Sequence, residues 1–257
     1  MSTHIPSFFS ATRGLWTLTW RSKLTWKRLL PVVASMIAVP VFAVSVIDPG
    51  QEDGFHRILI DLYFFVIIPF ACLFNFGSMI RDELQDDTIT FLVTRPVSRA
   101  KIFLLKYLTL MLWVQIILLG NGLAFFAAGI YLDIPNIASL ISLIIMTQVV
   151  AAMAFGALSS LIGMVTQKYL IAGVFYGFLV EFGIGQIPTN INVLSITRHL
   201  RTLLARNGDL ADLYDWSAAG ASFSFGMILG GTALFLTVGA LLFNFREYHA
   251  TEEMQKN

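Results

Sequence analysis

Six long apolar stretches run through the sequence, and they restrict the possible folds more than any other feature. A helix that crosses a membrane needs about 20 mostly apolar residues, and stretches of this kind recur along the whole chain. They are continuous, whereas the strands of a membrane barrel alternate apolar and polar residues. The sequence therefore predicts an all-α polytopic membrane protein, with six transmembrane helices at approximately 31–47, 58–80, 102–131, 137–165, 169–187 and 218–245.

The charge content excludes several other classes of protein. Charged residues make up 13% of the 257 residues, whereas soluble domains carry roughly 25%. This excludes a soluble enzyme and a disordered protein. It also excludes a nucleic-acid binder, which would require a basic face, whereas the formal net charge of +1 says little by itself. The single cysteine, Cys72, and four scattered histidines predict neither a disulfide nor a metal site. We expect one transmembrane domain over residues 1–257 in a lipid bilayer.

The positions of the basic residues predict the orientation of the chain. Lysine and arginine accumulate on the cytoplasmic side of membrane proteins. If the N-terminus is cytoplasmic, 13 of the 17 lysines and arginines lie inside, and the four outside are Arg57, Arg198, Arg201 and Arg206. We therefore expect a multi-pass protein of the plasma (inner) membrane with both termini cytoplasmic. A cleavable signal peptide is the competing interpretation, but the basic leader is much longer than such signals have.

Two segments outside the spans have helical patterns. In residues 5–28, aromatic and apolar residues recur at near-helical spacing among basic ones, which is typical of a helix in the headgroup layer. We expect an interfacial elbow helix there, with a disordered basic tail as the alternative. Residues 188–217 form the expected extracytoplasmic helical segment. Its predicted apolar face consists of Val193, Leu194, Thr197, Leu200, Leu203 and Leu204.

The segment between the second and third spans has an ordered polarity. Its acidic start suits a helix N-terminus, Leu84, Thr88 and Phe91 follow on one face, and Pro96 ends the helix. We expect a compact cytoplasmic helix over residues 82–94 that a soluble partner binds. The alternative is a solvated turn, although a turn needs only about 2–8 residues.

The same segment resembles the ABC-2 type permeases of ABC transporters. The resemblance rests on an acidic stretch, a threonine, an apolar run, an Arg-Pro-Val-Ser-Arg sequence and a lysine in the next span. These residues are Glu83, Thr88, Phe91 to Thr94, Arg95 to Arg99 and Lys106. The motif covers about twenty residues, and the layout of elbow, six spans and outer segment extends the resemblance to the full chain. One departure is Asp87, where family members often have glycine.

The resemblance implies a dimer of permeases, expected here as a homodimer, each bound to a cytoplasmic ATPase subunit through the helix at 82–94. Because the chain has no Gly-x-x-x-x-Gly-Lys-Ser/Thr loop, ATP and Mg are expected on the partner, and this chain is expected to be neither an enzyme nor a cofactor binder. We expect an exporter. An extracytoplasmic accessory protein is a further partner compatible with the resemblance. The expected coupling residues are Asp82, Glu83, Asp86, Asp87, Thr88, Phe91, Arg95, Pro96 and Arg99.

Two acidic residues lie within apolar stretches, where a charge costs about 2.5–3.5 kcal/mol on insertion scales. Asp61 follows Arg57 by one turn, so the spacing favours an interfacial ion pair, and a role in transport is the alternative. Glu181 has no basic residue within a turn and precedes a break at Gly183 and Pro188. A broken helix at membrane depth is tolerated only where it packs against protein or lines a water-filled cavity. Both residues are therefore candidates for a transport route or gate, and hydrogen bonding to a neighbouring span is the alternative for Glu181.

Two other functions remain compatible with the sequence. One is a secondary transporter or channel that needs no ATPase, although the sequence shows no internal repeat. The other is a membrane scaffold for an assembly complex. The nearly apolar spans favour a lipidic or amphipathic cargo, or a mechanical role. They do not identify the substrate.

Overall fold

The computed structural model describes residues 16–17, 20, 26–79, 98–183 and 190–245. Within these ranges every regular element is a helix, which confirms the all-α prediction. The helices up to residue 165 are α2 (Trp26–Val46), α3 (Glu52–Arg57), η1 (Ile58–Ile67), α4 (Ile68–Phe76), α7 (Arg99–Tyr131) and α8 (Ile137–Val165). The remaining helices are α9 (Tyr169–Tyr176), η2 (Gly177–Gly183), η4 (Asn190–Leu194), α10 (Ile196–Leu204), α11 (Gly208–Tyr214) and α12 (Ala221–Phe245).

Four of these helices are long and apolar enough to cross a membrane. They are the continuous helix Glu52–Phe76, α7, α8 and α12. Two shorter apolar helices, Val33–Val46 and Tyr169–Gly183, lie where the sequence predicts the first and fifth spans. The described part of the chain is therefore a multi-pass helical bundle.

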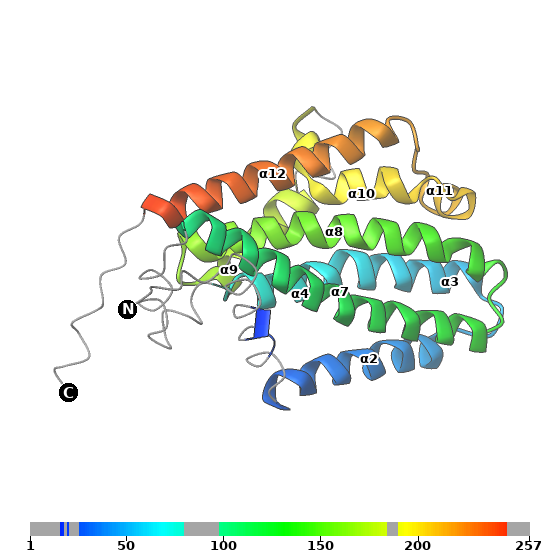
Figure 1. The fold of residues 1–257 in the computed structure, drawn as a ribbon. Coiled ribbons are helices and arrows are strands. Elements are labelled where there is room, and N and C mark those ends of the chain that lie inside the picture. The colour runs from blue at the N-terminus through cyan, green and yellow to red at the C-terminus, as the bar shows by residue number, and fades with distance from the viewer. Residues whose placement is uncertain (1–15, 18–19, 21–25, 80–97, 184–189, 246–257) are drawn as a thin grey trace, which may run out of the picture.

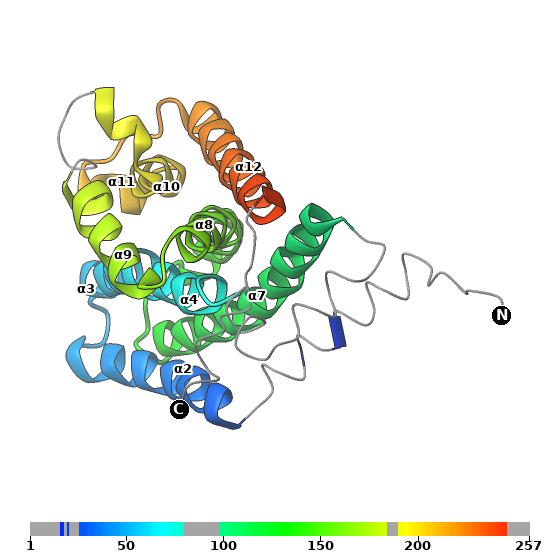
Figure 2. The same ribbon diagram turned by 90° about the vertical axis from the view of Figure 1, so that its left-hand side faces the viewer.

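The long helices lie side by side, with α8 in the middle of the bundle (Figures 1 and 2). The helices α4, α7, α10 and α12 pack around α8, and α2 packs on α7. We call the end of the bundle that contains Glu52, Tyr131 and Ile137 the α3 end. The opposite end, which contains Arg99 and Val165, is called the α9 end.

Glycines on α8 allow α4 to approach it very closely. A Cβ atom on Gly163 would lie 2.2 Å from the carbonyl oxygen of Gly77, and one on Gly156 would lie 2.8 Å from the ring of Phe76. Real Cβ atoms do not approach backbone oxygens at such distances. Small residues at helix interfaces permit this backbone approach in membranes. The contact fixes α4 against α8 on one side of the candidate site.

Both helices that border the candidate site contain π-helical turns, over Ile58–Ile67 and Gly177–Gly183. Pro69 follows the first π-helical segment. A proline has no N–H group, and its ring clashes with the carbonyl four residues earlier, so a widened turn relieves the clash. π-Helical turns are rare and frequently occur at functional sites.

A polar network crosses the apolar interior and joins three helices. The hydroxyl of Tyr63 hydrogen-bonds the carbonyl oxygen of Leu118 at 2.7 Å and Gln148 Oε1 at 2.5 Å. Gln148 Nε2 in turn donates to Gln115 Oε1 at 3.2 Å. Hydrogen bonds between spans stabilise membrane bundles. The network thus ties η1, α7 and α8 together near mid-bundle.

The helices η4, α10 and α11 lie in the segment predicted to be extracytoplasmic. Leu200, Leu203 and Leu204 of α10 are buried where that helix packs on α8 and α12. Thr197 is also buried, whereas Leu194 of the predicted face is 69% exposed. Leu194 differs because it ends η4, a 3-10 helix, and therefore lies outside the periodicity of α10.

Candidate functional site

Most of the predicted coupling residues lie outside the described residues. This applies to Asp82, Glu83, Asp86, Asp87, Thr88, Phe91, Arg95 and Pro96. Arg99 is described and begins α7 at the α9 end of the bundle. The predicted elbow over 5–28 also lies largely outside the described residues. In it, Trp16 stacks on Trp20, and Trp20 meets Trp113 of α7 edge to face.

The two helices that flank the undescribed segment are joined by a buried lysine. Lys106 of α7 is 5% exposed and its Nζ donates to the carbonyl oxygen of Met79 at 3.0 Å. The carbonyls near a helix C-terminus carry partial negative charge, so the ammonium group suits this position. Lys106 therefore fixes the end of α4 to the start of α7.

The polar centre of the candidate site is Glu181, in the π-helical turn of η2. Its side chain is 6% exposed. Oε1 accepts hydrogen bonds from the Tyr176 hydroxyl at 2.9 Å and the Ile196 amide at 3.2 Å. Oε2 accepts from the Ser195 hydroxyl at 2.7 Å, the Thr197 amide at 2.8 Å and the Thr197 hydroxyl. Five donors therefore converge on one carboxylate.

These contacts make Glu181 a cap for α10. The first N–H groups of a helix have no partner within the helix, and Glu181 satisfies those of Ile196 and Thr197. Ser195 is the N-cap residue, and its hydroxyl accepts from the Arg198 amide at 3.2 Å. A helix N-terminus favours a negatively charged group. The carboxylate thereby joins η2 to α10 across a sequence separation of about fifteen residues.

Next to this cap, Arg201 lies among aromatic rings. Its guanidinium carbon is 5.1 Å from the centroid of the Phe65 ring and 5.7 Å from that of Trp216. Trp216 stacks on Tyr214 at 4.3 Å, and the Arg57 guanidinium lies 5.5 Å from the Tyr214 ring. Cations held over aromatic faces are stabilised by the ring quadrupole. We call Arg57, Phe65, Arg201, Tyr214 and Trp216 the cation–aromatic cluster.

Arg201 also connects the two acidic residues that the sequence singled out. Burial lowers the pKa of the Arg201 guanidinium, and the nearby carboxylates of Asp61 and Glu181 oppose that change. Burial raises the pKa of the Tyr214 phenol, and Asp61 adds to the rise. The fold thus places Asp61 and Glu181 around one arginine. Sequence reasoning did not assign Arg201 to the site, because a residue 20 positions from Glu181 gives no periodic signal.

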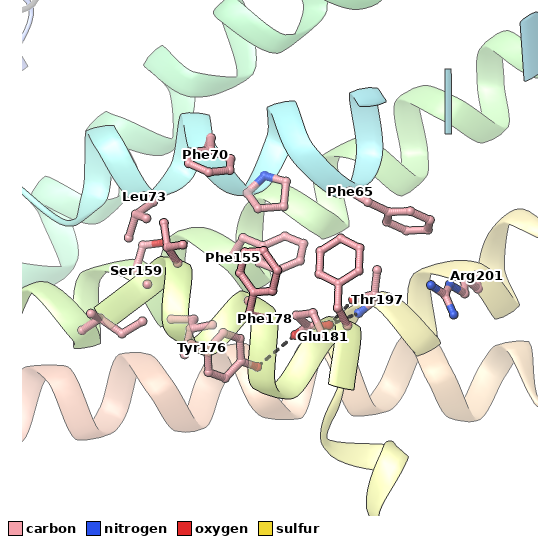
Figure 3. A pocket seen from close by; sticks show the side chains of 17 residues that line it. Phe65, Phe70, Leu73, Phe155, Ser159, Tyr176, Phe178, Glu181, Thr197 and Arg201 are labelled. Atoms are coloured by element: carbon pink, nitrogen blue, oxygen red, sulfur yellow. Dashed lines mark hydrogen bonds between the residues drawn. The ribbon is translucent and has the colours of Figure 1, made fainter. Parts of the chain in front are cut away.

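A cavity of about 110 Å³ lies beside Glu181 and Arg201, between α4, α8 and the α9–η2 helix. Its walls are mainly aromatic and aliphatic, and Glu181, Thr197 and Arg201 form a polar side (Figure 3). Figure 3 shows Phe155 and Phe178 in the space between α4 and Glu181. We call this cavity the aromatic chamber.

The arrangement can act as a mechanical link. Any displacement of α10 away from η2 must break the hydrogen bonds on Glu181, and it must also change the polar side of the aromatic chamber. Such a link couples the position of α10 to the α9–η2 helix.

The long apolar helices define a multi-pass α-helical membrane protein. Comparison with protein families sharpens this assignment. Residues 20–183 match the family described as ABC-2 family transporter protein, and the chain belongs to this family. No curated protein matches the chain.

Proposed function

We propose that this chain is the permease subunit of an ATP-driven exporter that works with a separate cytoplasmic ABC ATPase. The observation that carries the proposal is the family match over residues 20–183, which includes the segment 82–94. ATP and Mg belong to the partner in this proposal, because the chain has no phosphate-binding loop. Two copies form a homodimer, and each contributes one ATPase docking segment.

In the proposed topology the chain has six spans, an elbow helix before the first, and both termini in the cytoplasm. The α9 end of the bundle is then cytoplasmic, and α10 and α11 lie at the extracytoplasmic side. The 13 basic residues on the proposed inner side support this orientation. Single cysteines at Ser10, Thr90 and Lys256 should resist an impermeant thiol reagent in intact cells, whereas cysteines at Gln51 and Asn207 should react. Labelling at Thr90 would refute the orientation.

ATPase docking is tested by reversing one charge in the segment between the second and third spans. Glu83→Lys should weaken co-purification of the ATPase, because removing one member of an interfacial charge pair costs about 2–5 kcal/mol. Asp212→Lys is the matched control, since Asp212 is an exposed acidic residue of α11 at the opposite end. Phe91→Ala should retain part of the binding but uncouple ATP hydrolysis from transport, because it removes a packing contact without removing a charge.

The outcome of this experiment separates the proposal from its alternatives. If no ATPase co-purifies with the wild-type chain, a secondary transporter or channel becomes the better interpretation. If the ATPase binds but no transport accompanies its activity, a scaffold is favoured. If Glu83→Lys and Phe91→Ala behave like wild type, the segment at 82–94 is only a turn.

We also propose that Glu181, with Asp61 near it, belongs to the transport route or its gate. The support is the burial of the Glu181 carboxylate, its bonds to the start of α10, and its place on the polar side of the aromatic chamber. Opening would move α10 and release these bonds. Glu181→Gln should then lower substrate-stimulated ATPase activity in a complex that still assembles, and unchanged activity would assign Glu181 to packing alone.

A further inference from the structure

A second and larger cavity lies between α8, α10 and α12, three helices that pack against one another (Figure 2). Its volume is about 400 Å³, and it shares no lining residue with the aromatic chamber. Aliphatic side chains from all three helices and Phe225 of α12 form most of its wall. We call it the α12 cavity. Its apolar wall suits the hydrocarbon part of a ligand.

The volume of the α12 cavity sets the size of that ligand. An apolar cavity of about 150 Å³ holds benzene, which has six carbon atoms. On the same scale a cavity of about 400 Å³ accommodates roughly sixteen non-hydrogen atoms. Met146 lines the cavity and is 55% exposed, so the cavity is open at the surface of the bundle and a chain can enter from the bilayer.

The charge at the α12 cavity is positive. Arg206, directly after α10, lines it, and none of the described lining residues is acidic. The Arg206 side chain is exposed and forms no ion pair within the described ranges. A guanidinium group binds the oxygens of a carboxylate or a phosphate through two parallel hydrogen bonds. The lining therefore favours a ligand with an anionic head.

A buried hydroxyl in the same lining also lacks a partner. Thr147 of α8 is 2% exposed and lines the cavity, and no hydrogen bond joins its hydroxyl to another described residue. Other threonines in these helices, such as Thr109 and Thr232, donate to the carbonyl oxygen four residues earlier. Because a buried hydroxyl without an acceptor is unfavourable, Thr147 favours a ligand that brings an oxygen atom into the cavity.

The charged and apolar parts of the lining lie at different depths. Arg206 lies between α10 and α11, towards the α3 end of the bundle (Figure 1). Since α8 begins at that end, Val150 lies roughly 10 Å deeper than Leu143, at a rise of about 1.5 Å per residue. The cavity thus runs from a cation near the end of the bundle to an apolar wall nearer its middle. A membrane amphiphile arranges its head and chain in the same order.

We propose that the α12 cavity binds a single-chain amphiphile with an anionic head, either a carboxylate or a phosphate. The head lies against Arg206, one of its oxygens accepts a hydrogen bond from the Thr147 hydroxyl, and the chain extends towards Val150 and Phe225. This site goes beyond the proposed function, because it lies apart from Glu181 and its occupancy requires no ATPase.

The test uses dodecyl phosphate with a photoreactive diazirine on its chain, added to the full-length protein in nanodiscs of zwitterionic lipid. After illumination, mass spectrometry of peptides should find saturable labelling within 143–150 and next to Phe225. Unlabelled dodecyl phosphate or dodecanoate should displace the probe at least about tenfold better than dodecanol, which has the same chain length and no charge. The stronger of the two anions identifies the head. Inorganic phosphate, which has no chain, should not compete.

Two variants test the head group. Arg206→Gln should weaken dodecyl phosphate about tenfold and leave dodecanol unchanged. Arg57→Gln is the matched control, since Arg57 is another exposed arginine towards the same end and does not line the cavity, and it should behave like wild type. Thr147→Val keeps the shape of the side chain and removes the hydroxyl, so it should weaken dodecyl phosphate about threefold to tenfold.

A further pair of variants tests the position of the chain. Ser222→Leu places a larger side chain in the lining of the cavity and should weaken dodecyl phosphate and dodecanol alike, at least about tenfold. Gly226→Leu is the control, because Gly226 lies one turn further along α12, does not line the cavity, and has no atom within 4 Å of a Cβ. It should bind both molecules like wild type.

Several results would overturn the proposal. They are the absence of saturable labelling at these peptides, as when a second copy of the chain covers the cavity, equal competition by dodecanol in wild type, and unchanged competition in a well-folded Arg206→Gln protein. ATPase co-purification is measured on the same samples. A protein that binds its ATPase but is not labelled refutes this inference alone, whereas a labelled protein without an ATPase refutes only the proposed function.

Discussion

Replacing Glu181 by glutamine should loosen the junction between η2 and α10 and leave the rest of the bundle intact. Glutamine has nearly the same shape, but one of its two terminal groups is a donor. Both carboxylate oxygens accept a backbone N–H group in the native protein, from Ile196 and Thr197. Whichever way the amide turns, one of these buried N–H groups faces another donor.

The magnitude follows from the number of stranded donors. A buried donor without a partner costs about 1–3 kcal/mol, and the hydroxyls of Tyr176, Ser195 and Thr197 can rotate towards other acceptors. We therefore expect Glu181→Gln to cost about 1–3 kcal/mol. Glu181→Ala strands both amides and should cost roughly twice as much on the same basis.

The assay is hydrogen exchange measured by mass spectrometry on the purified protein. In Glu181→Gln, the amides of Ile196 and Thr197 should exchange about 5- to 150-fold faster, because 1.4 kcal/mol corresponds to a factor of ten. Protection within α7 and α8 should not change. Glu52→Gln, a substitution of the same kind in the first turn of α3, should leave exchange at residues 196–197 unaltered.

Equal exchange at Ile196 and Thr197 in wild type and Glu181→Gln would refute the capping role of Glu181. Faster exchange throughout the bundle would also contradict the reasoning, because it would mean that the carboxylate stabilises the whole fold instead of one junction.

Three further predictions concern packing, the polar network and pH. Gly163→Leu should prevent stable folding, because its Cβ meets the Gly77 carbonyl oxygen at 2.2 Å, and size-exclusion chromatography of the solubilised protein measures the loss. Tyr63→Phe should lower thermal stability by about 1 kcal/mol through loss of its bond to Gln148. Burial lowers the pKa of His199 below its ordinary value of 6.5. Unfolding therefore takes up a proton below pH 6.5, and stability should fall as the pH drops through that range, by at most about 1.4 kcal/mol per pH unit.

Each of these predictions has a control. Gly177→Ala should be tolerated because the position is open, and Tyr131→Phe should be neutral because Tyr131 is 74% exposed. His199→Gln should reduce the loss of thermal stability between pH 7.5 and 5.5. A folded Gly163→Leu protein, an unchanged Tyr63→Phe protein, or an identical pH dependence in His199→Gln would contradict the corresponding prediction.

The sequence predicted the helical class of the protein and the position of its longest helices. The fourth predicted span, 137–165, coincides with α8, because hydropathy reports directly on burial in a bilayer and helices there satisfy their own backbone. The Arg-Pro-Val-Ser-Arg sequence also indicated the ABC-2 transporter family, to which residues 20–183 show that the chain belongs. These signals are local, so neighbours in the sequence suffice to detect them.

Only the tertiary structure decided what Glu181 contacts. Its donors lie in Ser195, Ile196 and Thr197 beyond a break in the helix, and no periodicity predicts the path of the chain across that break. Gly173 and Gly177 illustrate the same limit, since they lie four residues apart in the sequence but differ in their surroundings. A Cβ atom on Gly173 would lie 2.4 Å from Leu73, whereas Gly177 faces an open position. Hydropathy determines which segments enter the bilayer, but packing between helices distant in the sequence determines which polar groups meet there. The aromatic chamber exists only because that packing brings α4, α8 and η2 together around Glu181 and Arg201.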